Sequence, residues 1–260
     1  MSALEGRVAL VTGAGRGVGR GIARKLALEG AVVAVNYRRD EESAQATVSE
    51  IRSAGGTAAA YQASIDRWDD CERMVRQVLD EHGKVDILVN NGGIASSGAT
   101  VVDTDPEEVS RLFNTHALGP FMLSKLLMPQ MRLLERSDII MISSSTTATA
   151  PPMSAPYTMA KSAMETLART LTIEEREHGI RVNTIAPGLV ATDMGDRLAK
   201  AITGGEADGA DAFGAGSPFG RVCRPEDVAA VVAFLVSEGG FYITGARVVV
   251  DGGSDPIFGR

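Results

Sequence analysis

Apolar runs rich in β-branched residues alternate with segments of helical periodicity along the whole chain. Seven runs of strand length are present, at 7–12, 31–37, 57–64, 86–90, 138–143, 181–186 and 246–251. Strands that alternate with helices form βαβ units, in which the strands pair in parallel. The runs are almost continuously apolar, which is typical of strands that helices cover on both faces. The pattern predicts an α/β fold with a doubly wound, seven-stranded parallel sheet and helices on both faces.

Length and composition favour one domain over residues 1–260. The chain is 44% hydrophobic, and α/β folds often reach this size as one unit. The net charge of −7 argues against nucleic acid or a membrane surface as partner. The first residues run into a strand without a signal-peptide core, so we expect a cytoplasmic protein. Cys71 and Cys223 are isolated and the histidines are scattered, so we expect neither a disulfide framework nor a structural metal.

A glycine-rich stretch at 204–217 interrupts the alternation of strands and helices. It holds too many glycines for a stable helix, so we expect a mobile loop there. The wider segment at about 192–217 is expected to be a mobile lid over the substrate, because lids of this kind set specificity.

A turn with four glycines follows the first predicted strand directly. Gly13, Gly17 and Gly19 are spaced G-x-x-x-G-x-G before a helix, with Arg16 and Val18 between them. Glycines permit a tight turn and let the backbone approach a pyrophosphate, and the helix start offers unpaired N–H groups. These five residues are therefore predicted to bind a dinucleotide. A tight strand-to-helix turn without a ligand is the alternative.

Basic residues end the second predicted strand, in Tyr37-Arg38-Arg39. An acidic residue at this point binds the ribose hydroxyl of NAD, whereas arginine favours the 2′-phosphate of NADP. Together with Arg16, two or three guanidinium groups could converge on that phosphate. We therefore expect NADP(H), with NAD(H) as the alternative. The two arginines could also pair with the acidic residues at 40–42.

A tyrosine and a lysine lie four residues apart after the fifth predicted strand. Tyr157 and Lys161 share one helical face, and Ser144 follows the end of the strand. A free phenol has a pKa of about 10, and a nearby ammonium stabilises its phenolate. A serine hydroxyl can hold a carbonyl oxygen while the tyrosine gives it a proton, as hydride addition to a carbonyl requires. Such Tyr-x-x-x-Lys pairs also arise by chance, so the assignment rests on its context.

With these motifs the chain resembles the short-chain dehydrogenase/reductase family over essentially its whole length, and within it the 3-oxoacyl-[acyl-carrier-protein] reductases most. The matching segments are Thr12-Gly-x-x-x-Gly-x-Gly19, Asn90-Asn91-Gly92-Gly93, Ser144 with Tyr157-x-x-x-Lys161, Asn183, Pro187-Gly188, and Thr244-Gly245 with Val250-Asp251-Gly252-Gly253. The resemblance implies a single Rossmann-type domain, a nicotinamide cofactor and, as is usual in the family, a homotetramer.

The resemblance also implies roles for individual residues. Tyr157 would be the acid or base, Ser144 would orient the substrate oxygen, and Lys161 would hold the nicotinamide ribose. Thr192 would hold the nicotinamide carboxamide, and the adenine would lie near residues 64–65. The implied cofactor-binding residues are Gly13, Arg16, Gly17, Val18, Gly19, Tyr37, Arg38, Arg39, Ser64, Ile65, Asn91, Gly92, Tyr157, Lys161, Pro187, Gly188, Val190 and Thr192.

Three positions depart from the family pattern. Gly92 stands where the family has alanine, and Ser64 stands where an aspartate commonly meets the adenine amino group. The catalytic asparagine of the family lies three residues before a glycine. Counted back from Gly119, that position is His116, with Asn114 two residues earlier. We assign His116, which could relay a proton through water, in preference to Asn114. A packed histidine without a role in turnover is the alternative.

The expected function is that of an NADP(H)-linked carbonyl reductase or alcohol dehydrogenase for a small carbonyl or a 3-oxoacyl thioester. Alternatives are an NAD(H)-dependent alcohol dehydrogenase for another small substrate and a dinucleotide-binding protein with little turnover. Arg132 and Arg136 only hint at a basic docking patch for an acyl carrier protein. A predicted helix at 106–134 is expected to serve both the core and a tetramer interface. Its apolar residues are Leu112, Phe113, Leu123, Leu126, Leu127 and Met131.

Overall fold

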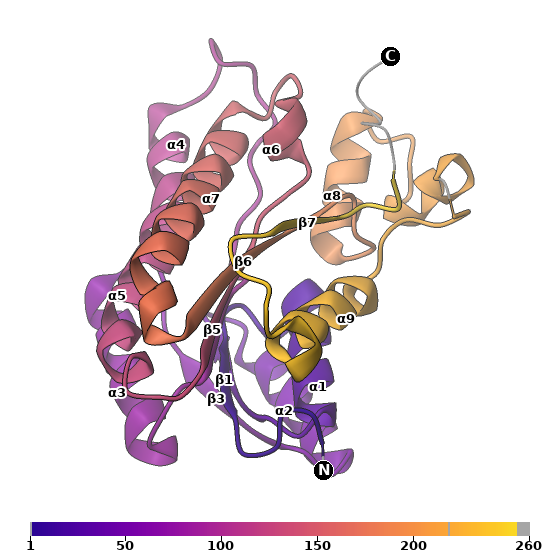
Figure 1. Ribbon diagram of the computed structural model, residues 1–260. Coiled ribbons are helices and arrows are strands. Elements are labelled where there is room, and N and C mark those ends of the chain that lie inside the picture. Colours follow the sequence, from indigo (N-terminus) through magenta and orange to yellow (C-terminus); the bar gives the residue numbers. More distant parts are fainter. Residues whose placement is uncertain (1, 218, 254–260) are drawn as a thin grey trace.

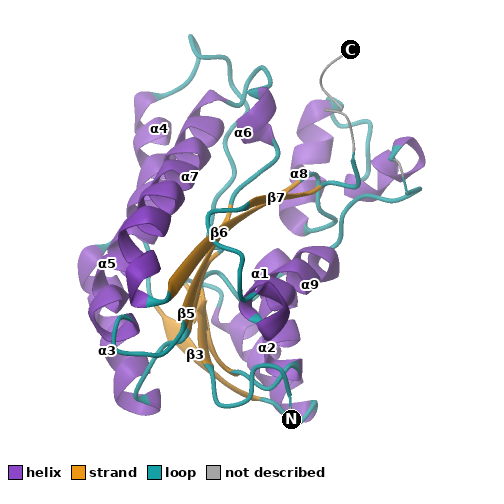
Figure 2. Ribbon diagram, in the orientation of Figure 1, coloured by secondary structure: helices purple, strands orange, loops and turns teal. Residues whose placement is uncertain are grey.

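Seven parallel strands form the centre of the computed structural model, which describes residues 2–217 and 219–253 (Figures 1 and 2). Their order in the sheet is β3-β2-β1-β4-β5-β6-β7. The strands are β1 Val8–Val11, β2 Val32–Tyr37, β3 Thr57–Gln62, β4 Ile87–Asn90, β5 Ser137–Ile142, β6 Ile180–Pro187 and β7 Arg247–Val250. Every strand lies within two residues of its predicted bounds, so the predicted seven-stranded parallel sheet is confirmed.

Helices cover both faces of this sheet (Figure 1). One hydrophobic core lies under α1, α2 and α9, and a second lies under α3, α5 and α7. The α-helices are α1 Gly17–Leu28, α2 Glu41–Ser53, α3 Trp68–His82, α4 Pro106–Phe113, α5 Gly119–Met131, α6 Thr146–Thr149, α7 Ala155–Glu175, α8 Asp193–Ile202 and α9 Pro225–Val236. The doubly wound arrangement is therefore confirmed. No helix among the described residues combines the length and the apolar character that crossing a membrane requires.

The helix predicted at 106–134 differs from the expected continuous α-helix. A π-helical turn, Asn114–Leu118, joins α4 to α5. Pro120 has no N–H group, so it cannot donate the hydrogen bond that an α-helix would send to the carbonyl of His116. The backbone accommodates this with bonds that reach five residues, such as that from the N–H of Gly119 to the carbonyl of Asn114.

The tetramer interface expected on this helix stays a prediction, and the structure shows which of its six apolar residues lie in the core. Four of its six apolar residues are completely buried and belong to the core, namely Leu112, Leu123, Leu127 and Met131. Leu126 is partly buried against the same core, and Phe113 is exposed. The apolar side chains on the outer face thus include Phe113 of the six, together with Leu118 and Phe121, which the sequence did not single out.

The glycine-rich stretch at 204–217 contains a short 3-10 helix, Ala210–Gly216. Its start is held by Asp196 of α8, whose Oδ1 accepts a hydrogen bond of 2.8 Å from the N–H of Ala210. Sequence composition predicted a loop without helix, and this side-chain contact from α8 is what stabilises the 3-10 turn.

The strand order reverses between β1 and β4, since the chain builds the sheet outward in both directions from this pair. In open parallel sheets, ligands bind outside the carboxyl ends of the strands at such a point. The turns after β1, β4, β5 and β6 all lie at this end, and they carry nearly all the residues singled out by the sequence motifs.

Candidate active site

The glycine turn after β1 is shaped for close contact between backbone segments. Gly13 and Gly17 have φ values of +61° and +53°, a region that favours glycine. A Cβ atom on Gly19 would lie 2.5 Å from Nδ2 of Asn91, so only glycine fits there. The start of α1 has no side-chain cap, which leaves its N–H groups open to an anion.

Two asparagines hold this turn in place. Asn91 Nδ2 donates hydrogen bonds of 2.9 and 3.3 Å to the carbonyls of Thr12 and Gly13. Asn36 Oδ1 accepts from the N–H of Gly13 at 3.2 Å, and its Nδ2 donates to the carbonyl of Ala63. Sequence analysis missed Asn36. Its signal is a single amide within the apolar strand β2, where it is completely buried.

A cleft of about 450 Å³ opens beside the turn. The starts of α1, α2 and α8 meet around it, and its lining includes Arg16, Arg20, Arg24, Asp40, Ser43 and Thr192. Arg16 lies 3.7 Å from Asp40, and both side chains are well exposed. The starts of three helices thus border one cleft, and of these three only α1 lacks a side-chain cap on its N–H groups.

Arg38 and Arg39 are exposed just beyond β2. Within the described part of the chain, neither guanidinium forms an ion pair with the acidic residues at 40–42 or with any other carboxylate. Asp40 instead caps α2 by accepting from the N–H of Ser43 at 3.1 Å. Tyr37 lies on the same strand end, and burial raises the pKa of its phenol.

Ile65 explains why glycine replaces alanine at position 92. A Cβ atom on Gly92 would lie 2.8 Å from Cδ1 of Ile65 and 3.3 Å from Oγ1 of Thr12. A Cβ atom on Gly119 would likewise lie 2.8 Å from the carbonyl oxygen of Ile65. The Ser64 hydroxyl bonds to Asp66 at 2.5 Å, so an aspartate does lie beside this position.

The turn after β6 forms the opposite wall of the cofactor region. The Pro187 carbonyl accepts a hydrogen bond of 2.8 Å from the N–H of Ser145, and Gly188 bonds to Val250 of β7. Val190 is buried. Thr192 caps α8 by accepting from the N–H of Gly195 at 3.1 Å. Its methyl group faces the glycine turn, because a Cβ built on Gly17 would lie 3.4 Å from it.

Ser144, Tyr157 and Lys161 lie together at the carboxyl end of β5. The Ser144 hydroxyl contacts the Tyr157 phenol by a hydrogen bond. Lys161 Nζ lies 5.8 Å from the centre of the Tyr157 ring and donates a 2.6 Å hydrogen bond to the carbonyl of Ile142. Lys161 is 3% exposed. The spacing of these residues in sequence thus corresponds to one group in space.

Burial changes the acidity of both groups. Desolvation raises the pKa of Tyr157 to about 12, while the hydrogen bond from Ser144 opposes that rise. Desolvation lowers the pKa of Lys161 to about 7, and the negative charge of Glu165 opposes that fall. Tyr157 therefore keeps its proton at neutral pH, whereas Lys161 can lose or regain one.

His116 lies on the π turn against the reactive group. Its ring meets the Tyr157 ring edge to face, with 5.2 Å between ring centres. Nε2 lies 2.9 Å from the carbonyl oxygen and 3.3 Å from the backbone nitrogen of Ile94, and Nδ1 is buried with no hydrogen-bond partner among the described residues. Burial lowers the pKa of His116 to about 3, with a further contribution from Lys161. Asn114, the other candidate, is exposed on the same turn.

The loop after β4 is clamped to the same helical run. Glu108 of α4 is buried and accepts hydrogen bonds of 2.7, 2.7 and 2.6 Å from the Ser96 hydroxyl, the Ser97 N–H and the Ser97 hydroxyl. These bonds lower the pKa of Glu108, with the Ser97 hydroxyl as the largest cause. Sequence analysis missed this clamp. Over residues 2–217 and 219–253, no three His, Cys, Asp or Glu side chains gather as a metal site would require.

The geometry can be compared with known proteins. Residues 13–255 match the family model described as Enoyl-(Acyl carrier protein) reductase. This span covers the glycine turn, the Ser144, Tyr157 and Lys161 group, and nearly the whole sheet. The chain belongs to the short-chain dehydrogenase/reductase family. As a member of that family it is an oxidoreductase with a nicotinamide cofactor.

Individual relatives of this short-chain dehydrogenase/reductase are reductases. The tetrahydroxynaphthalene reductase of Pyricularia oryzae is 38% identical, with 97% of this chain and 91% of that protein covered. The 3-oxoacyl-[acyl-carrier-protein] reductase of Synechocystis sp. is 34% identical, with 97% and 98% covered. A short-chain dehydrogenase from Burkholderia cenocepacia, solved in complex with NADP, superposes with a TM-score of 0.87 at 31% identity, with 96% and 98% covered.

Proposed function

We propose that this short-chain dehydrogenase/reductase is an NADPH-dependent carbonyl reductase in which Tyr157 gives the proton to the carbonyl oxygen. The observation that carries the proposal is the single group formed by Ser144, Tyr157 and Lys161 beside the glycine turn. A reductase needs both parts at one edge of the sheet, because the hydride and the proton must reach neighbouring atoms of the same carbonyl.

The residues beside the cleft fit a dinucleotide that carries a 2′-phosphate. Arg38 and Arg39 are exposed and have no carboxylate partner in the described part of the chain, and α1 starts without a side-chain cap. The tightly fitted backbone at Gly13 and Gly19 permits close approach of a pyrophosphate. The bound nicotinamide would supply the hydride that the carbonyl carbon accepts. The structure of the Burkholderia cenocepacia relative with NADP supports the phosphorylated cofactor, with NAD(H) as the alternative.

Each side chain has a task in the proton transfer. Thr146 donates a 2.9 Å hydrogen bond to the Ser144 oxygen, so the Ser144 proton, which the Tyr157 phenol accepts in this structure, can turn to a substrate oxygen. Tyr157, still protonated at neutral pH, transfers its proton to that oxygen as the new C–H bond forms. The phenolate left behind is stabilised by Ser144 and the Lys161 ammonium until water returns a proton.

A small cyclic or aromatic ketone is the substrate class that we propose. The 38% identical relative acts, by its name, on a hydroxylated naphthalene. An acyl carrier protein would need a basic surface, but Arg132 and Arg136 are both committed to ion pairs. Arg132 binds Glu175 at 2.7 Å, and Arg136 lies 3.6 Å from buried Asp138. A 3-oxoacyl thioester is the second candidate, favoured by the Synechocystis sp. relative.

Three further properties belong to the proposal. The segment at 192–217 would act as the mobile substrate lid, because Met194, Leu198 and Ile202 of α8 expose apolar surface that a substrate could cover. The location would be cytoplasmic, which the free thiols of Cys71 and Cys223 favour. The assembly would be a homotetramer.

Substitution of Tyr157 by phenylalanine tests the chemistry. We expect Tyr157→Phe to lower kcat with NADPH and a panel of cyclic ketones by about 10²- to 10⁴-fold, because the proton donor is lost while the ring stays. NADPH binding, measured by fluorescence, should remain. Tyr242→Phe, at a phenol that is 97% exposed, is the matched control and should retain full activity. A wild-type protein that binds NADPH and reduces no ketone would instead support a binding protein with little turnover.

Substitution of the two arginines tests the cofactor. We expect the double variant Arg38→Ala with Arg39→Ala to raise KM for NADPH at least about tenfold, since each charged hydrogen bond is worth about 1.5–3 kcal/mol. KM for NADH should stay unchanged. Arg76→Ala, at an exposed arginine on α3, is the control. Equal increases in KM for NADPH and NADH would show that these arginines do not recognise the 2′-phosphate.

A further inference from the structure

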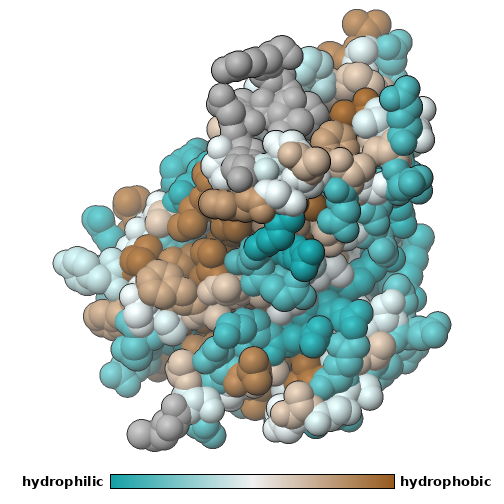
Figure 3. Space-filling view, turned by 90° about the vertical axis from the view of Figure 1, so that its right-hand side faces the viewer, coloured by the Kyte–Doolittle hydropathy of each residue, from teal (hydrophilic) through white to brown (hydrophobic). Residues whose placement is uncertain are grey.

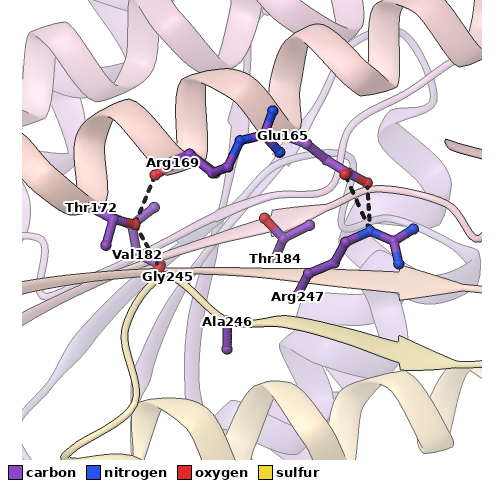
Figure 4. A pocket seen from close by; sticks show the side chains of 9 residues that line it. Glu165, Arg169, Thr172, Val182, Thr184, Gly245, Ala246 and Arg247 are labelled. Carbon is purple, nitrogen blue, oxygen red and sulfur yellow. Dashed lines mark hydrogen bonds and ion pairs between the residues drawn. The ribbon is translucent and has the colours of Figure 1, made fainter. Parts of the chain in front are cut away.

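One acidic side chain close to the reactive group has no part in the mechanism above. Glu165 lies one helical turn beyond Lys161 on α7, on the same face. Glu165 is 8% exposed, and its buried carboxylate accepts hydrogen bonds from several side chains. Oε1 accepts hydrogen bonds of 2.6 Å from Ser143, 2.7 Å from Thr147 and 3.1 Å from Nε of Arg247. Figure 4 shows Glu165 and Arg247 in direct contact, and both side chains line the same small cavity.

Arg247 comes from the edge strand β7, 82 residues away along the chain. Besides Glu165, its Nη2 donates to the carbonyl of Ser144 at 3.2 Å and to the hydroxyl of Thr147 at 2.7 Å. Ser143 and Thr147 are also bound by the carboxylate itself. The ion pair therefore holds both ends of the turn that carries the Ser144 hydroxyl, and a shift of about 1 Å in such a group can cost 10²-fold in rate.

The same carboxylate is the acidic group next to Lys161. Tyr157 and Glu165 on α7 and His116 on the π turn are the titratable groups that interact with Lys161 in the described structure, and β5 contributes only the carbonyl of Ile142. His116 is neutral and Tyr157 keeps its proton at neutral pH. Glu165 thus supplies the negative charge that favours the Lys161 ammonium.

We propose that Glu165 and Arg247 form a positioning pair that holds the Ser144 turn, with the Glu165 carboxylate placed one helical turn beyond Lys161 as its negatively charged neighbour. The proposal rests on the role of Lys161 given above. Neither residue touches the reacting atoms; both act through groups that do. Arg247 has a second effect, because its positive charge partly neutralises the carboxylate as seen from Lys161. Removal of Glu165 should therefore lower the pKa of Lys161, and removal of Arg247 should raise it.

The pKa of Lys161 can be read without turnover. The chain has five lysines, so lysine labelled with ¹³C at Cε gives a simple NMR spectrum in which Lys161→Arg identifies one signal. We expect Glu165→Gln to lower the titration midpoint of that signal by about one pH unit, because the opposite charge is lost. The pH at which kcat for carbonyl reduction falls on the alkaline side should decrease by the same amount, because the Lys161 ammonium then loses its proton at a lower pH.

Glu175→Gln is the matched control. Glu175 is a buried glutamate on the same helix, paired with Arg132 at 2.7 Å, but it lies roughly 21 Å along the axis from Lys161. Its substitution should lower thermal stability as Glu165→Gln does and leave the Lys161 midpoint in place. Equal midpoints for Glu165→Gln and Glu175→Gln would overturn the proposal.

Arg247→Gln provides the second arm and covers the case in which Glu165→Gln does not fold. Its side chain is 29% exposed at the sheet edge, so the substitution is mild for the core. We expect the Lys161 midpoint to rise by about half a pH unit, and kcat to fall severalfold with KM for NADPH unchanged. A midpoint that falls or stays would overturn the proposal. The NMR arms need no turnover, so an inactive protein with these shifts would contradict the proposed function alone.

Discussion

His116 carries an unusual combination of contacts for a buried histidine. Nε2 meets both the carbonyl oxygen of Ile94, at 2.9 Å, and the N–H of Ile94, at 3.3 Å, and the shorter contact favours the tautomer with the ring proton on Nε2. In that tautomer Nδ1 is an acceptor that has no partner among the described residues. Gly93 is required beside it, because a Cβ there would lie 2.6 Å from Cε1 of the ring. A buried lone pair of this kind is suited to a water or a substrate hydroxyl.

At the residue scale we therefore expect His116→Asn to change turnover without removing a titration step. The ring is neutral above its pKa of about 3, so its removal should not change the pH dependence of kcat near neutral pH. We expect kcat to fall about tenfold, because the edge contact with Tyr157 and the Ile94 anchor are lost and the smaller side chain leaves a gap. The measurement is kcat against pH.

The control for that substitution is Asn114→Ala, on the exposed side of the same turn. It should leave kcat and the pH profile unchanged. A loss with Asn114→Ala as large as with His116→Asn would transfer the role to Asn114. Wild-type turnover in both variants would leave His116 as a packed histidine.

At the scale of elements, the sequence predicts the strands well for a physical reason. Strands covered on both faces must be apolar at every position, as in the run Val8–Val11, so they stand out from amphipathic helices. The glycine turn and the Tyr157 to Lys161 spacing are predictable as well, because each is set within a few residues along the chain.

Features made by residues distant in sequence could not be predicted in this way. The π turn depends on Pro120 in combination with the close passage of Gly119 over Ile65, and only the proline is visible as a local signal. Glu165 resembles any charged helical residue until β7 brings Arg247 beside it. Asn36 could have been noticed as an amide in an apolar strand, although its partner Gly13 lies in another βα unit.

At the scale of the whole molecule, exposed apolar side chains gather on two separate faces. The first is on the α4 to α5 run, where Phe113, Leu118 and Phe121 are each about 40% exposed or more. The second surrounds α9 and β7 and includes Phe234, Phe241, Tyr242 and Val249. Figure 3 shows hydrophobic surface gathered on this second side. β7 is also an edge strand, whose outer backbone groups no described strand pairs.

Two such faces on one chain suit a tetramer with two kinds of twofold interface. We expect four chains of 27.3 kDa to sediment as one particle. Phe121→Glu should break the first interface and Val249→Lys the second, because each places a charge in an apolar contact, so each variant should sediment as a dimer. The double variant should be a monomer. Leu28→Glu, at a leucine on α1 that is 71% exposed and belongs to neither group of residues, should remain a tetramer. A monomeric wild type, or dissociation by Leu28→Glu as well, would contradict this assembly, because the effect would then not depend on the two faces.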